Sequence, residues 1–181
     1  MGRVSQAQAQ ENRARVVAAA ARLFREAGTD VSVADVMKAV GLTHGGFYKQ
    51  FASKEALVTE AAALAFEEQR ELRARQDEAH PDARAAREGL IDWYLSAEHR
   101  DCPADGCPSA GLSMDMARTA DLETRAVYAA GVREFADWLA TEGEDDGVAR
   151  LCTLVGAILL SRATAGTPLS DELLAAARKA L

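Results

Sequence analysis

The stretch that decides the fold reads SVADVMKAVGLTHGGFYKQFASKEALV, residues 32–58. Ser32 is a favourable N-cap for a helix over Val33–Val40, because its side-chain oxygen can accept a hydrogen bond from a free backbone N–H. Gly41 follows where a tight turn needs a positive φ, and Thr43 caps a second short helix. Two short helices joined by a glycine turn are typical of a DNA-binding helix-turn-helix.

The second short helix, which we expect to run through Gln50, has an inner and an outer face. Phe47 and Phe51 are four residues apart, so both can face the core. A rotation of 100° per residue then places four residues on the open side, Gly45, Gly46, Tyr48 and Lys49. Paired glycines are unfavourable in a helix, but they let DNA approach the backbone closely. The alternative is that they only extend the turn.

Lys54 falls in the first turn of the next predicted helix. A cation is unfavourable beside the positive end of a helix dipole, whereas the free N–H groups of that turn bind anions well. We therefore expect Lys54 to join those groups around one DNA phosphate, with a solvated lysine as the alternative. Tyr48 can likewise donate its hydroxyl to a phosphate or only lie on the surface.

Outward from this stretch, apolar periodicity predicts helices along the whole chain. A first helix starts before Asn12 and ends at Ala27, and its apolar stripe is Val16, Ala20, Leu23, Phe24 and Ala27. Further helices are expected over Lys54–Glu78, 82–99, 109–118, 121–141, 145–165 and 170–180, with a loop over 100–111. The fold class is therefore all-α with about nine helices. We predict a head, residues 1–54, that binds DNA, and a body, residues 55–181, that binds an effector and dimerises.

Charge separates these two parts. The chain has 181 residues and a net charge of −7. The head carries eight lysines and arginines against four acidic residues, which leaves +4 there and −11 on the body. A basic head on an acidic body is expected if only the head meets phosphate. Met1–Gln10 lacks the apolar run of a signal peptide, and no stretch has membrane-spanning length, so we expect a soluble, cytoplasmic protein.

The segments NRARVVAAAARLFREAG, residues 12–28, and SVADVMKAVGLTHGGFYKQFASKEALV resemble the N-terminal domain of the TetR family of bacterial repressors. The resemblance implies a homodimer that binds a palindromic operator in double-stranded DNA and is released by a small-molecule effector. Base-edge or groove contacts would then come from Thr43, His44, Gly45, Gly46 and Lys49. Phosphate contacts would come from Ser32, Tyr48 and Lys54, with Gln50 as a further candidate. His44 can equally be a solvated capping residue.

Aromatic and sulfur side chains concentrate in the middle of the body. We expect them to line an effector pocket, although any one of them can be plain core. The candidates are Trp93, Tyr94, Cys107, Leu112, Met114, Met116, Tyr128, Phe135 and Trp138.

The segment LCTLVGAILLSR, residues 151–162, is apolar nearly all round. Such a helix must be buried on both sides, and a second copy of the chain is the expected cover. The predicted dimer interface comprises Leu151, Leu154, Val155, Ile158, Leu159, Leu173 and Leu174. An ordinary core helix is the alternative.

Cys107 precedes Pro108 at an expected helix start, where a thiolate would be stabilised. It can be a regulatory thiol with Cys102 as resolving partner, acting on the DNA through the helix over Lys54–Glu78. It can equally be a buried, inert side chain. Together with His99 these cysteines lack zinc-site spacing, so we expect no metal.

Two other classes of protein fit the sequence poorly. An enzyme would need a nucleophile with a base, a phosphate loop or a metal set, whereas the three histidines are scattered at His44, His80 and His99. A helical adaptor that binds only protein does not explain the basic head. The sequence thus predicts a transcriptional regulator that needs no cofactor and is not an enzyme.

Overall fold

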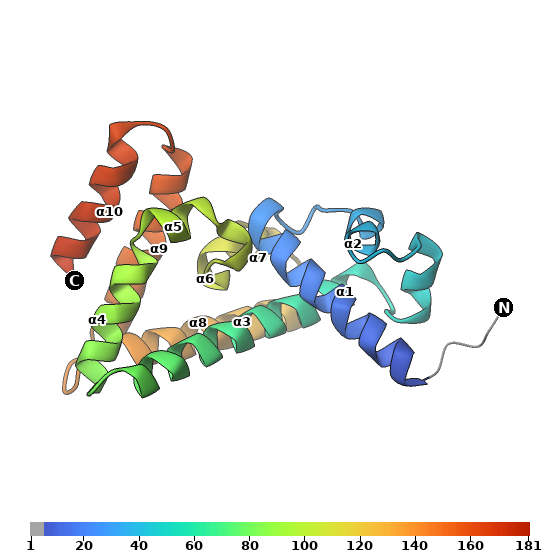
Figure 1. The fold of residues 1–181 in the computed structure, drawn as a ribbon, viewed down its shortest axis with the longest axis horizontal. Helices are drawn as coiled ribbons and strands as arrows, with labels where there is room; N and C mark the ends of the chain where they lie inside the picture. Colours follow the sequence, from blue (N-terminus) through green and yellow to red (C-terminus); the bar gives the residue numbers. More distant parts are fainter. Residues whose placement is uncertain (1–5) are drawn as a thin grey trace.

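The computed structural model describes residues 6–181 as an all-helical chain, with no strand among those residues, as the sequence predicts (Figure 1). The head contains α1 (Gln6–Ala27), α2 (Val33–Ala39) and the 3-10 helix η1 (His44–Lys49). The long α3 (Lys54–Ala79) leads into the body. The body contains α4 (Ala83–Tyr94), α5 (Ala97–Asp101), the 3-10 helix η2 (Pro103–Asp105), α6 (Pro108–Gly111), α7 (Ser113–Arg118), α8 (Leu122–Leu139), α9 (Gly147–Ala163) and α10 (Pro168–Ala180).

Most local signals of the head form as predicted, but Thr43 precedes η1 without a capping hydrogen bond from its side chain. The Ser32 side chain accepts a hydrogen bond from the backbone N–H of Asp35 at 3.1 Å and so caps α2. Gly41 ends that helix with a φ of +71°, a conformation that favours glycine. Phe47 and Phe51 are buried, together with Val16, Ala20, Phe24, Val36 and Met37. Ala27, expected to continue the stripe of α1, is instead exposed because it lies in the last turn, beyond this core.

The long helix α3 joins the two cores. Its first half supplies Leu57, Ala61 and Ala65 to the core of the head, so that core extends past the expected boundary at residue 54. Its second half runs beside α8 (Figure 1). At Gly131 of α8 an added Cβ would overlap the Phe66 ring of α3, so only glycine allows this close approach.

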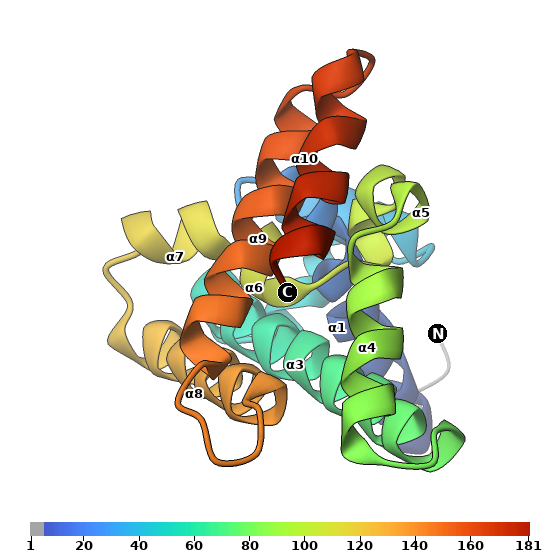
Figure 2. The ribbon, with the colours of Figure 1, turned by 90° about the vertical axis from the view of Figure 1, so that its left-hand side faces the viewer.

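The second core lies in the body. There α9 and α10 pack side by side, and α4 and α8 complete the cluster (Figure 2). Its largest buried side chains are Leu90, Ile91, Tyr94, Phe135, Leu139, Leu154 and Ile158. None of the described helices combines the length and apolarity that crossing a membrane requires.

The segment 82–111 differs from the expectation of one helix and a loop. The expected helix over 82–99 is broken after Tyr94, because Ser96 caps a new helix by accepting a hydrogen bond from the His99 N–H at 3.2 Å. The expected loop contains η2 and α6, which begin at Pro103 and Pro108. Proline suits the first position of a helix, since its missing N–H would have no helical partner there.

Candidate functional site

The predicted DNA-contacting residues gather on η1 and the two helix starts beside it. Thr43, His44, Gly45 and Lys49 are exposed, and Tyr48 is 66% exposed with its ring edge-on to those of His44 and Phe47. Gly46 and Lys54 are half-buried. Ser32 is exposed at the start of α2, where its hydroxyl also donates to Asp35 Oδ2 at 2.6 Å.

Two phenylalanines hold η1 in place. The Phe47 and Phe51 rings stack with centroids 5.1 Å apart, and the Arg13 guanidinium lies 4.7 Å from the Phe51 centroid. The predicted helix is a 3-10 helix rather than an α-helix, with about three residues per turn. This turns Gly46 partly inward, where an added Cβ would lie 3.6 Å from Met37 Cε.

The fold of the chain does not require glycine at residue 45. An added Cβ would meet no atom within 4 Å in the described part of the chain. Its φ is not positive either, since within residues 6–181 only Gly28, Gly41, Gly143 and Gly166 have that conformation. The fold therefore accepts a larger side chain at residue 45, and any requirement for glycine there comes from outside the chain.

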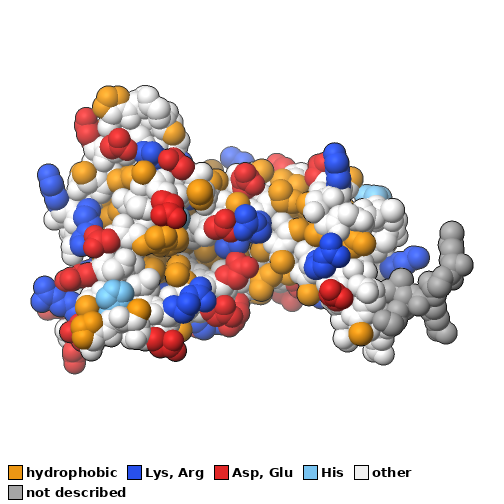
Figure 3. All heavy atoms as spheres, viewed as in Figure 1, with side chains coloured by type: hydrophobic (Ala, Val, Ile, Leu, Met, Phe, Trp, Pro, Cys, Tyr) orange, Lys and Arg blue, Asp and Glu red, His pale blue; other side chains and the backbone are white. Residues whose placement is uncertain are grey.

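The head carries cations without acidic partners on this side. Arg13, Arg22 and Arg25 form ion pairs with Glu60, Asp105 and Glu68. No carboxylate of residues 6–181 lies within 4 Å of the Lys38, Lys49 or Lys54 ammonium; Arg3 falls outside the described residues. Figure 3 shows acidic side chains to be denser over the body than over the end formed by α1 and α2. The charge left free on the head suits an anionic partner.

A cavity of about 310 Å³ lies in the body, next to the head. Four of the predicted pocket residues line it: Trp93, Tyr94, Cys107 and Phe135. The rest of the wall, in particular Arg25 of α1 and Gln69 and Leu72 of α3, was not predicted from the sequence.

The other pocket candidates lie elsewhere. Leu112 and Met116 are buried in the core of the head, and Met114 is exposed. Tyr128 donates its hydroxyl to Ser109 O at 2.6 Å, and Trp138 donates its indole N–H to Asp77. These five side chains line no part of the cavity.

Cys107 lies in a polar wall of the cavity. The thiol accepts a hydrogen bond from Gln69 Nε2 at 3.1 Å, and the backbone N–H donates to His99 Nε2 at 3.1 Å. Burial lowers the pKa of His99 to about 4, so the ring is neutral and its Nδ1 donates to Tyr94 O. Burial, with a smaller effect of Cys107, raises the pKa of the Tyr94 phenol well above its usual range.

The thiol chemistry expected at Cys107 has little local support. The helix that starts after it, α6, has only four residues, so its dipole is small. Cys107 is buried while Cys102 is exposed, and both are free thiols. Among residues 6–181 no three histidine, cysteine or acidic side chains form a cluster fit for a metal.

The residues predicted for a dimer interface divide into two groups. Leu151, Leu154, Ile158 and Leu174 are buried in the core of the chain itself, because α8 and α4 cover that side of α9. Val155, Leu159 and Leu173 are half-exposed. They share the outer face with further exposed side chains that the sequence analysis did not select: Val148, Cys152, Leu160 and Leu169.

Comparison with known proteins supports the resemblance. Residues 16–61 match the family model of the bacterial regulatory proteins, tetR family. The fold is similar to that of a TetR transcriptional regulator from Chloroflexus aurantiacus, with a TM-score of 0.76 and 25% identity over 97% of this chain and 94% of that one. A TetR-family regulator from Agrobacterium tumefaciens gives a TM-score of 0.79 at 18% identity over 96% and 98%.

Escherichia coli NemR in its reduced form has a similar fold too, with a TM-score of 0.73 at 18% identity over 93% of this chain and 96% of that one. A search of curated protein sequences finds no match.

Proposed function

We propose that this chain, a transcriptional regulator of the TetR family, represses transcription by binding a palindromic operator as a homodimer and leaves it when a small molecule binds. Proteins of this family are DNA-binding regulators and not enzymes, in agreement with the sequence analysis. The observation that carries the proposal is the exposed surface of η1 beside the start of α3, where neither the exposed Lys49 nor the half-buried Lys54 forms an ion pair within residues 6–181.

The proposed contact places η1 in the major groove. Thr43, His44 and Lys49 are exposed there and can reach base edges, while Gly45 lets the backbone come close. Lys54 and the N-terminal N–H groups of the 26-residue α3 would hold a phosphate on one side. Ser32 and Tyr48 would contact the phosphates on the other side.

The outer face of α9 and α10 is the proposed dimer interface. On α9, Val148, Cys152, Val155 and Leu159 follow one another at helical spacing on the exposed side. On α10, Leu169 and Leu173 continue this apolar face. A second copy of the chain related by a two-fold axis would cover it and present two heads to two half-sites.

The position of the cavity supports release by an effector. Arg25 is a buried residue of α1 in the head and also lines the cavity in the body. Its guanidinium donates to Gly106 O at 3.3 Å and to Glu68 Oε2 at 2.7 Å. A molecule that displaces Gly106 would thus move α1, and a shift between two head orientations would separate bound from released dimers.

A gel shift with selected DNA fragments at two salt concentrations tests the DNA-binding part. We expect bound fragments to share a near-palindrome and affinity to fall steeply with salt. Lys49→Ala should weaken binding, whereas Lys179→Ala, an exposed lysine at the end of α10, should not. A footprint over one asymmetric half-site, or equal loss in both variants, would contradict the proposal.

A further inference from the structure

The cavity has apolar walls and one polar end. Leu72, Leu90, Trp93 and Phe135 supply the apolar surface. Gln69, Tyr94 and Cys107 supply the polar end, where Gln69 Nε2 donates to the thiol. A volume of about 310 Å³ is at the lower end of the range for ligand pockets, so the ligand should be a small molecule of one or two rings.

Two polar atoms at this end have no partner. The Tyr94 hydroxyl and Gln69 Oε1 are both buried without a hydrogen bond of normal geometry, the Cys107 thiol being a weak neighbour of the hydroxyl, and the two residues are 1% and 7% exposed. A buried polar group without a partner is costly, so these atoms mark a place that a ligand group can complete. Tyr94 offers a proton, and Gln69 offers either end of its amide after rotation about its last torsion.

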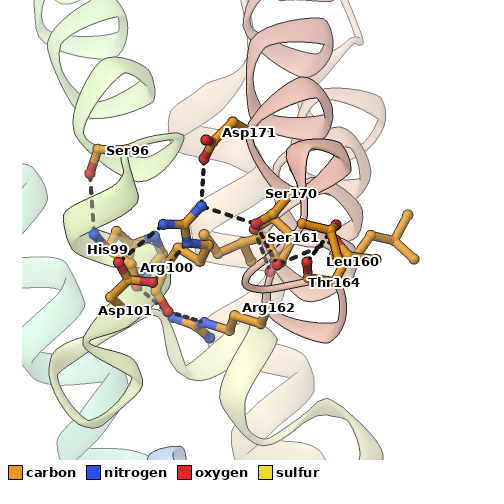
Figure 4. Close-up of polar contacts among 12 residues, drawn as sticks. Ser96, His99, Arg100, Asp101, Leu160, Ser161, Arg162, Thr164, Ser170 and Asp171 are labelled. Atoms are coloured by element: carbon orange, nitrogen blue, oxygen red, sulfur yellow. Dashed lines mark hydrogen bonds and ion pairs between the residues drawn. The ribbon is translucent and has the colours of Figure 1, made fainter.

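An arginine lies directly behind the wall. An added Cβ at Gly106, a lining residue, would be 2.9 Å from Arg162 Nη2. Arg162 donates only to the backbone oxygens of His99 and Arg100, at 2.8 and 3.1 Å. In Figure 4 the Asp171 carboxylate points to the Arg100 guanidinium rather than to that of Arg162. Within residues 6–181 no carboxylate oxygen comes within 4 Å of Arg162.

A second arginine lies behind the apolar wall. The Arg73 guanidinium is 5.4 Å from the centroid of the Phe135 ring, is almost fully buried, and has one Nη atom without a partner. Its nearest carboxylate, on Glu134, is 3.9 Å away. Burial lowers the pKa of both Arg73 and Arg162, with Glu134 opposing it at Arg73 and Tyr94 at Arg162.

The acidic side chains at the mouth of the cavity do not cancel the positive charge of Arg73 and Arg162. Its three acidic residues each have an arginine partner: Glu68 pairs with Arg25, Asp105 with Arg22 and Glu71 with Arg75. The acidic side chains at the mouth are thus balanced, and the two poorly paired cations behind the walls, Arg73 and Arg162, remain.

We propose that the effector of this regulator is a small, flat organic monoanion, such as an aromatic carboxylate, whose charged group meets Tyr94 and Gln69 under the field of Arg73 and Arg162. The inference rests on the proposed function, since it names the ligand class of the same cavity. The rings lie between Trp93 and Phe135. The Tyr94 hydroxyl donates to the carboxylate, and the Gln69 amide donates after rotation, which leaves its oxygen to accept from the Cys107 thiol.

Calorimetric titration of the full chain without DNA tests the ligand class directly. The probes are benzoate and 2-naphthoate, each compared with its uncharged amide, benzamide and 2-naphthamide. A charge-assisted hydrogen bond predicts that one acid or both bind roughly tenfold or more tightly than the amide. Tyr94→Phe and Arg73→Met should reduce this preference.

Matched controls are Tyr128→Phe, a tyrosine outside the cavity, and Arg133→Met, an exposed arginine on α8. Circular dichroism confirms that each variant is folded, and should Arg73→Met unfold, Arg73→Gln, which also removes the charge, replaces it.

The outcomes separate the ligand class from the proposed function. Amides that bind as tightly as the acids, or no binding by any of the four probes, overturn the monoanion. Acids that bind with the expected preference but do not release operator DNA support the ligand class and contradict effector release. Loss of preference in the control variants as well would show that the effect does not come from this cavity.

Discussion

Replacing Gly45 by alanine separates the stability of the head from its binding of DNA. The added methyl group would meet no atom within 4 Å, and the backbone is not in the left-handed region. Alanine is favoured over glycine in helical backbone by up to about 1 kcal/mol, mostly because it restricts the unfolded chain. We therefore expect Gly45→Ala to raise the free energy of unfolding by about 0.5–1 kcal/mol.

The same change should weaken operator binding. If η1 approaches the groove through Gly45, a methyl group at this residue would hold the backbone away from the DNA. No new contact with the DNA would compensate for this loss. A cost of about 1.4 kcal/mol corresponds to a tenfold loss of affinity, and we expect a loss of about that size or more. Thermal unfolding should at the same time show a melting temperature higher by roughly 2 °C, given the length of the chain.

Fluorescence anisotropy with labelled operator DNA and differential scanning calorimetry measure the two effects. Gly143→Ala is the unsuitable comparison, because Gly143 has a φ of +84°. Gly156→Ala is unsuitable too, because Gly156 faces outward on α9, in the proposed dimer interface. Arg133→Ala on α8 is the control, since Arg133 is exposed and lies outside both η1 and that interface. Unchanged DNA affinity in a stabilised Gly45→Ala protein would refute the close approach.

Four other changes test separate parts of the molecule. Lys54→Ala should weaken binding to all DNA sequences about equally and reduce the salt slope by roughly one unit, and a changed sequence preference at full affinity would exclude a phosphate contact. Leu159→Glu should give folded monomers in analytical ultracentrifugation, because an unpaired carboxylate would be buried at the interface, whereas Leu122→Glu on exposed α8 should stay dimeric. Cys107 should label with a thiol reagent as slowly as a buried thiol, since it is 4% exposed and bonded to Gln69; fast labelling, with an effector response lost in Cys107→Ser, would restore the regulatory thiol. Lowering the pH should destabilise the fold between about pH 6.5 and 4, because His99 stays neutral in the fold while the histidine of the unfolded chain takes up a proton. A folded-state pKa of about 4 corresponds to a loss of about 3 kcal/mol in the free energy of unfolding. His99→Gln should remove this pH dependence in denaturant melts.

The head was predictable because its signals are local. A serine cap, a glycine at the turn and two phenylalanines four apart all act within a few residues, and Ser32, Gly41, Phe47 and Phe51 lie as expected. The 3-10 form of η1 was not predictable. It depends on how Phe47 stacks on Phe51 against the rest of the head, and the Gly45–Gly46 pair weakens any preference for an α-helix.

The body was less predictable, because apolar periodicity does not say what covers a face. On α9 the spacing of Leu151, Leu154 and Ile158 and that of Val148 and Leu159 indicate two apolar faces equally well. Only packing shows that the first face meets α8 of the same chain. The cavity was hardest to predict, since its wall combines α1, α3, α4, η2 and α8, and residues such as Gln69 have no distinctive local pattern.

The sequence suggested a path between cavity and head along the helix from Lys54, and the structure offers a second one. Arg25 offers a shorter path, because α1 itself reaches the cavity wall. Its Nη1 holds Gly106 O while Nη2 holds Glu68 of α3, so one guanidinium joins the head, the body and the helix between them. On the same end of α1, Thr29 donates to Asp115 Oδ1 of α7 at 2.9 Å. We therefore propose that a ligand that presses on Gly106 would act on α1 through this one side chain, with α3 as the support.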